Sequence, residues 1–127
     1  MIWNIAPDRP VYVQLVEQLE LAIVAGEYRA GDRVPSVREL AADAAVNPNT
    51  MQRALQALEA RGLVNTQRTA GRTITEDRQK IETLRTEKAQ KQAEAFLEMM
   101  HTLGYTRRQA LELLAETVPA AQAKEEE

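Results

Sequence analysis

The chain has 127 residues, enough for one domain or for one small domain with an appendage, which excludes a large multidomain enzyme. It contains no cysteine, which excludes disulfide frameworks, thiolate metal sites and cysteine nucleophiles and fits a reducing cytoplasm. The longest uninterrupted apolar stretch, Leu21–Ala25, is far too short to cross a membrane, and the sequence shows no export signal.

Positive charge is concentrated in the middle of the chain. Overall, 16 basic and 19 acidic residues give a net charge of −3, which argues weakly against a polyanionic partner. Arginine can make two hydrogen bonds at once to a phosphate or a guanine, but it also forms ordinary surface ion pairs. Charge alone therefore does not distinguish a nucleic-acid-binding surface from an ordinary charged surface. Residues 36–75 carry a net charge of +2, from Arg38, Arg53, Arg61, Arg68 and Arg72 against Glu39, Asp43 and Glu59.

The first helix is predicted to follow a short N-terminal segment. Met1–Ile5 alternates weakly between apolar and polar residues, which indicates a short strand or an ordered arm in which Trp3 is packed. Apolar positions within Tyr12–Ile23 recur at spacings of three and four, the pattern of an amphipathic helix, and Pro10 is tolerated in its first turn. Gly26 is expected to end this helix.

A second, shorter helix is predicted to begin near Ser36. The preceding segment, Glu27–Val34, has no helical period and is expected to be a connecting loop. Ser36 and Glu39 have the spacing of a capping box, in which the hydroxyl accepts from an orphan backbone N–H and the carboxylate reaches back. The apolar pattern of this helix stops near Ala44–Val46.

A third helix is predicted from Pro48 to about Arg61. Asn47 followed by Pro48 is a strong signal for the start of a helix. Asn is a good N-cap, and proline is tolerated at the first helical position because a backbone N–H there would have no partner within the helix. Gly62 stands just past the end, where a left-handed residue is common.

A two-stranded hairpin is predicted next, from Leu63–Arg68 and Arg72–Thr75 with a turn at Thr69–Gly71. Three helices followed by such a hairpin are the elements of a winged helix-turn-helix, whose third helix can enter a DNA major groove about 12 Å wide.

The C-terminal part is predicted to be a pair of helices. Its Glu-, Lys-, Gln- and Ala-rich segment runs from Glu76 to Gly104 without an internal Pro or Gly, which indicates one long helix. Thr106 and Gln109 have capping-box spacing and open another helix, which Pro119 is expected to end.

These elements predict a mainly α protein with a small β wing. The expected organisation is a winged helix-turn-helix domain at residues 1–75, a two-helix dimerisation hairpin at 76–119, and an acidic, frayed tail at 120–127. Two helices with one apolar stripe each provide too little material for an independent core. A second copy of the chain would cover that stripe; the alternative is that the hairpin folds back on its own N-terminal domain. The side chains predicted to meet the second copy are Phe96, Leu97, Met100, Leu103, Leu111 and Leu114.

The exposed side of the third helix is predicted to be a nucleic-acid interface. Asn and Gln can pair with adenine through two hydrogen bonds, and Arg can do so with guanine. The structural alternative is that Asn47 only caps the helix, that Thr50 only bonds locally and that Arg53 is only solvated. The polar residues predicted on this side are Asn47, Asn49, Thr50, Gln52, Arg53 and Gln56.

A dense set of residues between positions 10 and 75 resembles the DNA-binding signature of GntR-family bacterial transcription regulators. The short two-helix C-terminal part resembles the YtrA-like branch, in which this piece serves dimerisation. The matching residues are Tyr12, Gln14, Ile23, Gly26, Gly31, Asp32, Pro35, Ser36, Arg38, Glu39, Leu40, Ala41, Val46, Asn47, Asn49, Thr50, Arg53, Ala54, Leu58, Gly62 and Leu63.

The resemblance implies roles for individual residues. It places Arg38 on the DNA at the start of the second helix and the beginning of the third helix in the groove. It places Arg68 and Gly71, with Arg72 beside them, where the wing approaches the minor groove or phosphates. The chain departs from the family at Thr69, where members usually have glycine, and this bears on the tightness of the turn and on the depth of wing insertion.

Two other classes of function compete with this interpretation. An enzyme is disfavoured because the single histidine, His101, allows no Ser-His-Asp set and no phosphate-binding glycine loop is present. Glu98 and His101 have the spacing of di-iron bundles, with Glu94 and Glu116 as further candidates, but an exposed imidazole is the commoner case. An RNA-binding or protein-interaction module is the other rival. No aromatic residue lies in the recognition region, which weighs against the stacking used on single strands.

The sequence therefore predicts a DNA-binding transcription regulator that acts as a repressor and binds a near-palindromic operator as a homodimer. It predicts no enzymatic activity, no cofactor and no membrane partner, and it leaves a small-molecule effector open.

Overall fold

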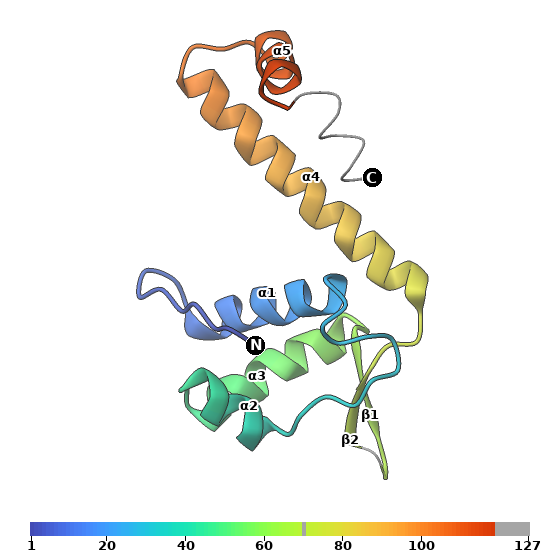
Figure 1. Ribbon diagram of the computed structural model, residues 1–127. Helices are drawn as coiled ribbons and strands as arrows, with labels where there is room; N and C mark the ends of the chain where they lie inside the picture. The colour runs from blue at the N-terminus through green and yellow to red at the C-terminus, as the bar shows by residue number, and fades with distance from the viewer. Residues whose placement is uncertain (70, 119–127) are drawn as a thin grey trace. The chain divides into compact units, whose positions relative to one another are not determined.

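The computed structural model describes residues 1–69 and 71–118 (Figure 1). By its internal contacts the chain divides into two compact units, residues 1–85 and residues 86–127. The first unit therefore extends beyond residue 75, because Ile81 and Leu84 of the following helix pack on its core. The functional boundary that the sequence places after residue 75 stays a prediction.

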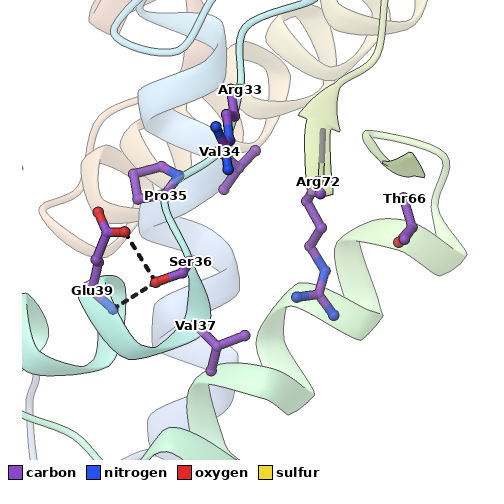
Figure 2. Close-up of a pocket in the computed structure, with 9 residues that line it drawn as sticks. Arg33, Val34, Pro35, Ser36, Val37, Glu39, Thr66 and Arg72 are labelled. Atoms are coloured by element: carbon purple, nitrogen blue, oxygen red, sulfur yellow. Dashed lines mark hydrogen bonds between the residues drawn. The ribbon is translucent and has the colours of Figure 1, made fainter. Parts of the chain in front are cut away.

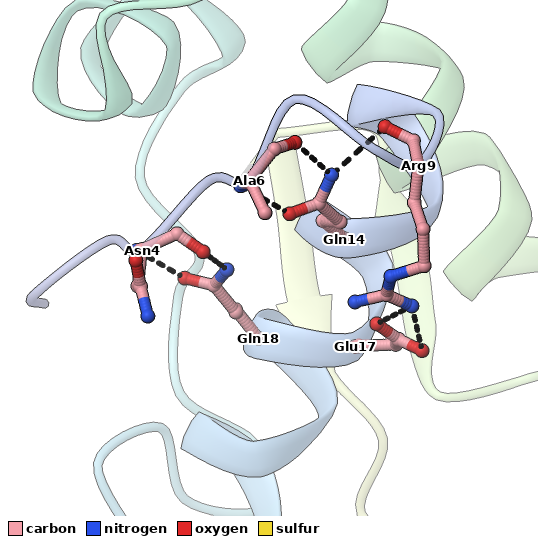
Figure 3. Close-up of polar contacts among 6 residues, drawn as sticks. All are labelled: Asn4, Ala6, Arg9, Gln14, Glu17 and Gln18. Atoms are coloured by element: carbon pink, nitrogen blue, oxygen red, sulfur yellow. Dashed lines mark hydrogen bonds and ion pairs between the residues drawn. The ribbon is translucent and has the colours of Figure 1, made fainter.

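The N-terminal segment is an arm fastened to the first helix, not a strand. Helix α1 (Val11–Val24) begins after Pro10, which is its N-cap and lies just outside the first turn where the sequence placed it. Buried Gln14 accepts from the Ala6 N–H at 2.7 Å, and its amide nitrogen donates to the carbonyls of Ala6 (2.7 Å) and Arg9 (2.9 Å). One turn later, Gln18 makes the same two-way bond with the backbone of Asn4 (Figure 3).

Helices α2 (Val37–Ala44) and α3 (Pro48–Ala60) form the helix-turn-helix, as predicted. The Ser36 hydroxyl accepts from the Glu39 N–H at 3.1 Å, but the Glu39 carboxylate accepts from that hydroxyl and not from the Ser36 N–H of a full capping box. The turn between the helices depends on Ala45, which has a left-handed backbone conformation with φ 56°. Asn47 caps α3 by accepting from the Asn49 N–H at 2.8 Å.

The wing consists of β1 (Val64–Gln67) and β2 (Gly71–Ile74), paired antiparallel with Val64 opposite Ile74. The segment predicted as a plain connecting loop also joins this sheet. The Val34 N–H donates to the Arg72 carbonyl (2.9 Å), and the Ile74 N–H donates to the Asp32 carbonyl (2.8 Å). The loop thus covers an edge of β2 that would otherwise expose unpaired backbone groups.

The core of the first unit is made by α1, α2, α3, the wing and the beginning of α4 (Arg78–Thr102). The predicted inward side of α3 is fully buried, so its opposite side faces outward. The buried core side chains include Leu15, Leu19, Ile23, Val34, Leu40, Met51, Ala54, Leu55, Leu58, Leu63, Val64, Ile74 and Leu84.

The second unit contains the rest of α4 and helix α5 (Arg107–Thr117). Both halves of the predicted capping box are present, since Thr106 accepts from the Gln109 N–H and Gln109 accepts from the Thr106 N–H. Arg107 and Glu94 form an ion pair at 3.4 Å between the two helices. Pro119 and the predicted tail at 120–127 lie outside the described residues. Within the described part of the chain, no helix is both long and apolar enough to span a membrane.

Candidate nucleic-acid interface

The outward side of α3 brings together the polar residues predicted from the sequence. Asn49 and Arg53, one helical turn apart, are both exposed, and Thr50 and Gln52 beside them are half-buried. Asn47 is exposed at the start of the helix. Because the first turn of a helix also presents unpaired backbone N–H groups and a partial positive charge, this end of α3 suits phosphates as well as base edges.

The capping role of Asn47 leaves part of its side chain available. Only the side-chain oxygen is used by the cap, where it accepts from the Asn49 N–H. The amide NH₂ makes no hydrogen bond with any described residue. Capping and contact with a base or phosphate are therefore compatible in the same side chain.

The beginning of α2 and the wing border one cavity of about 690 Å³ (Figure 2). Ser36 and Val37 line it from the helix side, while Thr66, Gly71 and Arg72 line it from the wing. Arg38, the next residue of α2, is exposed. The hollow lies between the start of α2 and the wing.

Ion pairing divides the five arginines of this region into two groups. Arg61 pairs with the buried carboxylate of Glu20, and Arg72 pairs through its Nε with Glu59. Arg38, Arg53 and Arg68 have no carboxylate within ion-pair distance among the residues that the structure describes, and all three are exposed. The local positive charge therefore rests on the residues Arg38, Arg53 and Arg68.

Glu59 ties the wing to α3. Besides Arg72 of β2, the hydroxyl of Thr66 on β1 donates to the same carboxylate oxygen at 3.0 Å. The hydrogen bond from Arg72 lowers the pKa of the Glu59 carboxyl, and the bond from Thr66 adds to that lowering against an opposing effect of burial. Arg72 thus holds the wing against α3, a role that the sequence did not indicate.

The turn of the wing does not require glycine at position 69. The left-handed residue is Gly71, with φ 71°, which pairs with Gln67 at the end of the hairpin. Thr69 has no positive φ, since Ala45 is the one non-glycine residue with that conformation in the described ranges. The family departure at Thr69 is therefore compatible with a closed hairpin, while Ala70 lies outside the described residues.

Residues 11–74 match the family model of bacterial regulatory proteins, gntR family. The chain belongs to the GntR family. It is similar to the HTH-type transcriptional regulator YhcF of Bacillus subtilis strain 168, with 36% identity over 105 residues, covering 83% of this chain and 87% of that protein. It also matches the HTH-type transcriptional repressor YtrA of the same strain at 40% identity over 68 residues, 54% of this chain and 52% of that one.

The likeness extends to a solved structure. A GntR family transcriptional regulator from Listeria monocytogenes superimposes with a TM-score of 0.81 at 37% identity, covering 88% of this chain and 98% of that chain. The predicted fold class and the predicted membership of the GntR family, with its YtrA-type relatives, are confirmed. The chain is a DNA-binding transcription regulator of winged helix-turn-helix type.

The C-terminal hairpin of this GntR regulator exposes most of the apolar side chains predicted to pair. Leu103 and Leu111 are 63% and 64% exposed, and Phe96 and Leu114 are also exposed. Leu97 is half-buried. Met100 is already buried within one chain, together with Ala110. Two further exposed apolar side chains, Met99 and Leu113, were not predicted from the sequence, because they lie outside the stripe of three- and four-residue spacings.

The candidate metal ligands are only partly brought together. Glu98 and His101 line one hollow in the second unit, beside Tyr105 and Arg107. Glu94, a further candidate, instead forms an ion pair with Arg107. Within the described ranges no group of three or more His, Cys, Asp or Glu side chains is placed to hold a metal ion.

A contact with Tyr12 was not foreseen from the sequence. The guanidinium carbon of Arg53 lies 3.7 Å from the centroid of the Tyr12 ring. Tyr12 is in the first turn of α1, and Arg53 is 41 positions later in the chain. The periodic pattern assigned Tyr12 only to the apolar stripe of its helix, and no local signal marks a pair so distant in sequence.

Proposed function

We propose that this GntR regulator is a repressor that binds a near-palindromic operator as a homodimer. In this proposal the start of α3 contacts the base edges in the major groove. The start of α2 and the wing contact the DNA backbone on either side of α3. The supporting observation is the exposed polar side of α3, flanked by arginines that no carboxylate neutralises in the described structure.

The roles of the contacting residues follow from their chemistry. Arg53 can donate two hydrogen bonds to guanine, while Asn49 and Gln52 can pair with adenine. Arg38 and Arg68 serve phosphates or the minor groove. Asn47, Thr50 and Gly71 contribute polar or backbone groups close to the phosphates. Arg72 is already held by Glu59, so we assign it to positioning the wing as much as to direct contact.

The homodimer is proposed because the second unit exposes so much apolar surface. Leu103, Leu111 and Leu114 are 63%, 64% and 42% exposed, and each is worth about 2 kcal/mol when fully buried. A two-fold pair would present two copies of α3 to half-sites separated by about one helical turn or a multiple of it.

The proposal that this regulator represses transcription rests on similarity. The relative YtrA, similar over 68 residues, is named a transcriptional repressor.

Two measurements test the proposal. Selection of bound duplexes from a random pool should yield a palindrome, and sedimentation at micromolar concentration should give twice the 14.2 kDa mass of one chain.

Arg38→Ala and Arg53→Ala should each weaken binding to the selected duplex by about 1 to 3 kcal/mol without unfolding the protein. Arg108→Ala, which removes the same charge from α5, is the matched control and should bind normally. Unchanged affinity in both test variants would refute the assigned interface.

A further inference from the structure

Arg53 is held by an aromatic ring and not by a carboxylate. Its guanidinium lies over Tyr12 at 3.7 Å from the ring centroid. With the described residues it makes no hydrogen bond or ion pair. Stacking of this kind covers one face of the planar guanidinium but leaves its N–H groups, which point outward in the plane, free to donate.

The ring itself stands on a firmly fixed part of the fold. Tyr12 follows Pro10 at the beginning of α1, where Gln14 bonds the backbone of Ala6 and Arg9 and so fixes the arm against the helix (Figure 3). An ion pair between Arg9 and Glu17 at 2.9 Å also links the arm to α1. The side chain of Tyr12 is half-buried, so it has little freedom to leave Arg53.

We infer that Tyr12 is a specificity-positioning residue, which orders Arg53 for guanine before DNA arrives. A long side chain that is free in solution loses rotamer freedom when it binds, and this loss weakens the contact. A guanidinium already stacked on a fixed ring has lost most of that freedom in the unbound protein. The inference rests on the proposed function, because it supposes that Arg53 reads a base pair.

The chain offers a matched pair of variants. Tyr12→Leu removes the ring and keeps an apolar side chain, while Tyr12→Phe keeps the ring and removes only the hydroxyl. Their affinities are measured on the duplex selected by the wild-type protein and on a set in which each base pair is changed in turn. Tyr12→Leu should bind the selected duplex about two- to tenfold more weakly, the range for ordering one long side chain. Tyr12→Phe should bind like the wild type.

The position of the effect separates positioning from simple damage to the fold. Tyr12→Leu should relax discrimination at the same base pair as Arg53→Ala and at no other, and it should add nothing in the Arg53→Ala background. Equal effects of the Leu and Phe variants, a uniform loss over all base pairs, additivity with Arg53→Ala, or a gain in affinity would each overturn the inference.

If Tyr12→Leu folds poorly, a measurement on the protein without DNA tests the same inference. ¹⁵N relaxation of the Arg53 Nε–H should show an ordered side chain in the wild type and in Tyr12→Phe; a disordered Arg53 in the wild type would overturn the inference. The two proposals also fail differently. If the wild-type protein selects no duplex, the proposed function fails and takes this inference with it. If the wild-type protein selects a duplex and the Arg53→Ala variant discriminates its base pairs equally well, only the role of Tyr12 and Arg53 fails.

Discussion

The two units of this protein differ in how far their apolar side chains are buried. In residues 1–85, Leu15, Met51 and Leu55 are completely buried, whereas in the second unit Leu103 and Leu111 are more than 60% exposed. The first unit therefore has a core within one chain. The apolar side of the second unit lacks such cover in its described residues, and under the proposed function a second copy provides it.

The largest expected effect comes from the core of the first unit. Leu55→Ala should lower the free energy of unfolding by about 2 to 5 kcal/mol, because it leaves a cavity among fully buried side chains. Leu21→Ala is the matched control, since Leu21 is 53% exposed and its truncation should cost less than about 0.5 kcal/mol. Urea unfolding followed by circular dichroism measures both. Similar losses in the two variants would contradict the burial contrast between them.

A substitution on the exposed apolar surface of the second unit should weaken dimerisation without destabilising the first unit. Leu111→Glu places a charge in the surface proposed to pair, which removes about 2 kcal/mol or more and weakens dimerisation at least about thirtyfold. Leu21→Glu adds the same charge to an exposed leucine of the first unit and should leave the dimer intact. Sedimentation across a concentration series gives the dissociation constant. A wild-type particle of 14.2 kDa would instead favour a hairpin folded back on its own chain.

A parallel contrast among the arginines should appear in the salt dependence of DNA binding. Arg68 has no carboxylate partner among the described residues, whereas Arg61 is paired with buried Glu20. Arg68→Ala should lower the slope of log affinity against log salt by about 1, because one phosphate contact no longer releases a counterion. Arg61→Ala should keep the slope and lose stability, since it removes the cation beside a buried carboxylate. The reverse pattern would exchange the roles assigned to the two residues.

Local signals predicted most of the fold and the position of the interface. The Asn47–Pro48 start, the Thr106–Gln109 capping box and Gly62 mark helix ends within a few residues, and apolar spacing gives the buried side of each helix. These signals are short-range, so they place elements along the chain. They therefore located the outward side of α3 correctly, while the contribution of its residues to DNA binding stays a prediction.

The contacts that determine which side chains are available could not be read from the sequence. Glu20 and Arg61 are 41 positions apart, as are Tyr12 and Arg53, and neither pair follows from helical periodicity. The pairing of Asp32–Val34 with the wing was missed because this segment has no alternation. Arg61 meets Glu20 and Arg53 meets Tyr12 because α1 packs against α3, and that packing is a tertiary property.

The tie between wing and α3 should make stability depend on pH. The pKa of Glu59 is lowered, chiefly by Arg72, so the ionised carboxylate stabilises the fold above the ordinary pKa of a glutamate. That contribution is lost as the pH falls through the lowered value. Glu59→Gln should therefore be less stable than the wild type by up to about 1 kcal/mol near neutral pH and equally stable in strong acid. Urea unfolding at both extremes measures the difference, and a gap that persists in acid would contradict the assignment.

The smallest expected effect is a gain in stability in the turn between α2 and α3. Ala45 has φ 56° and ψ 47°, a left-handed conformation that is costly for any residue with a Cβ. Ala45→Gly removes that cost, and although glycine makes the unfolded chain more flexible, the net gain should be about 0.5 to 1 kcal/mol. Ala42→Gly, an exposed position inside α2, is the matched control and should lose about as much, because its backbone is helical. If Ala45→Gly lowered the unfolding free energy as the control does, the left-handed backbone of Ala45 would carry no strain for glycine to relieve.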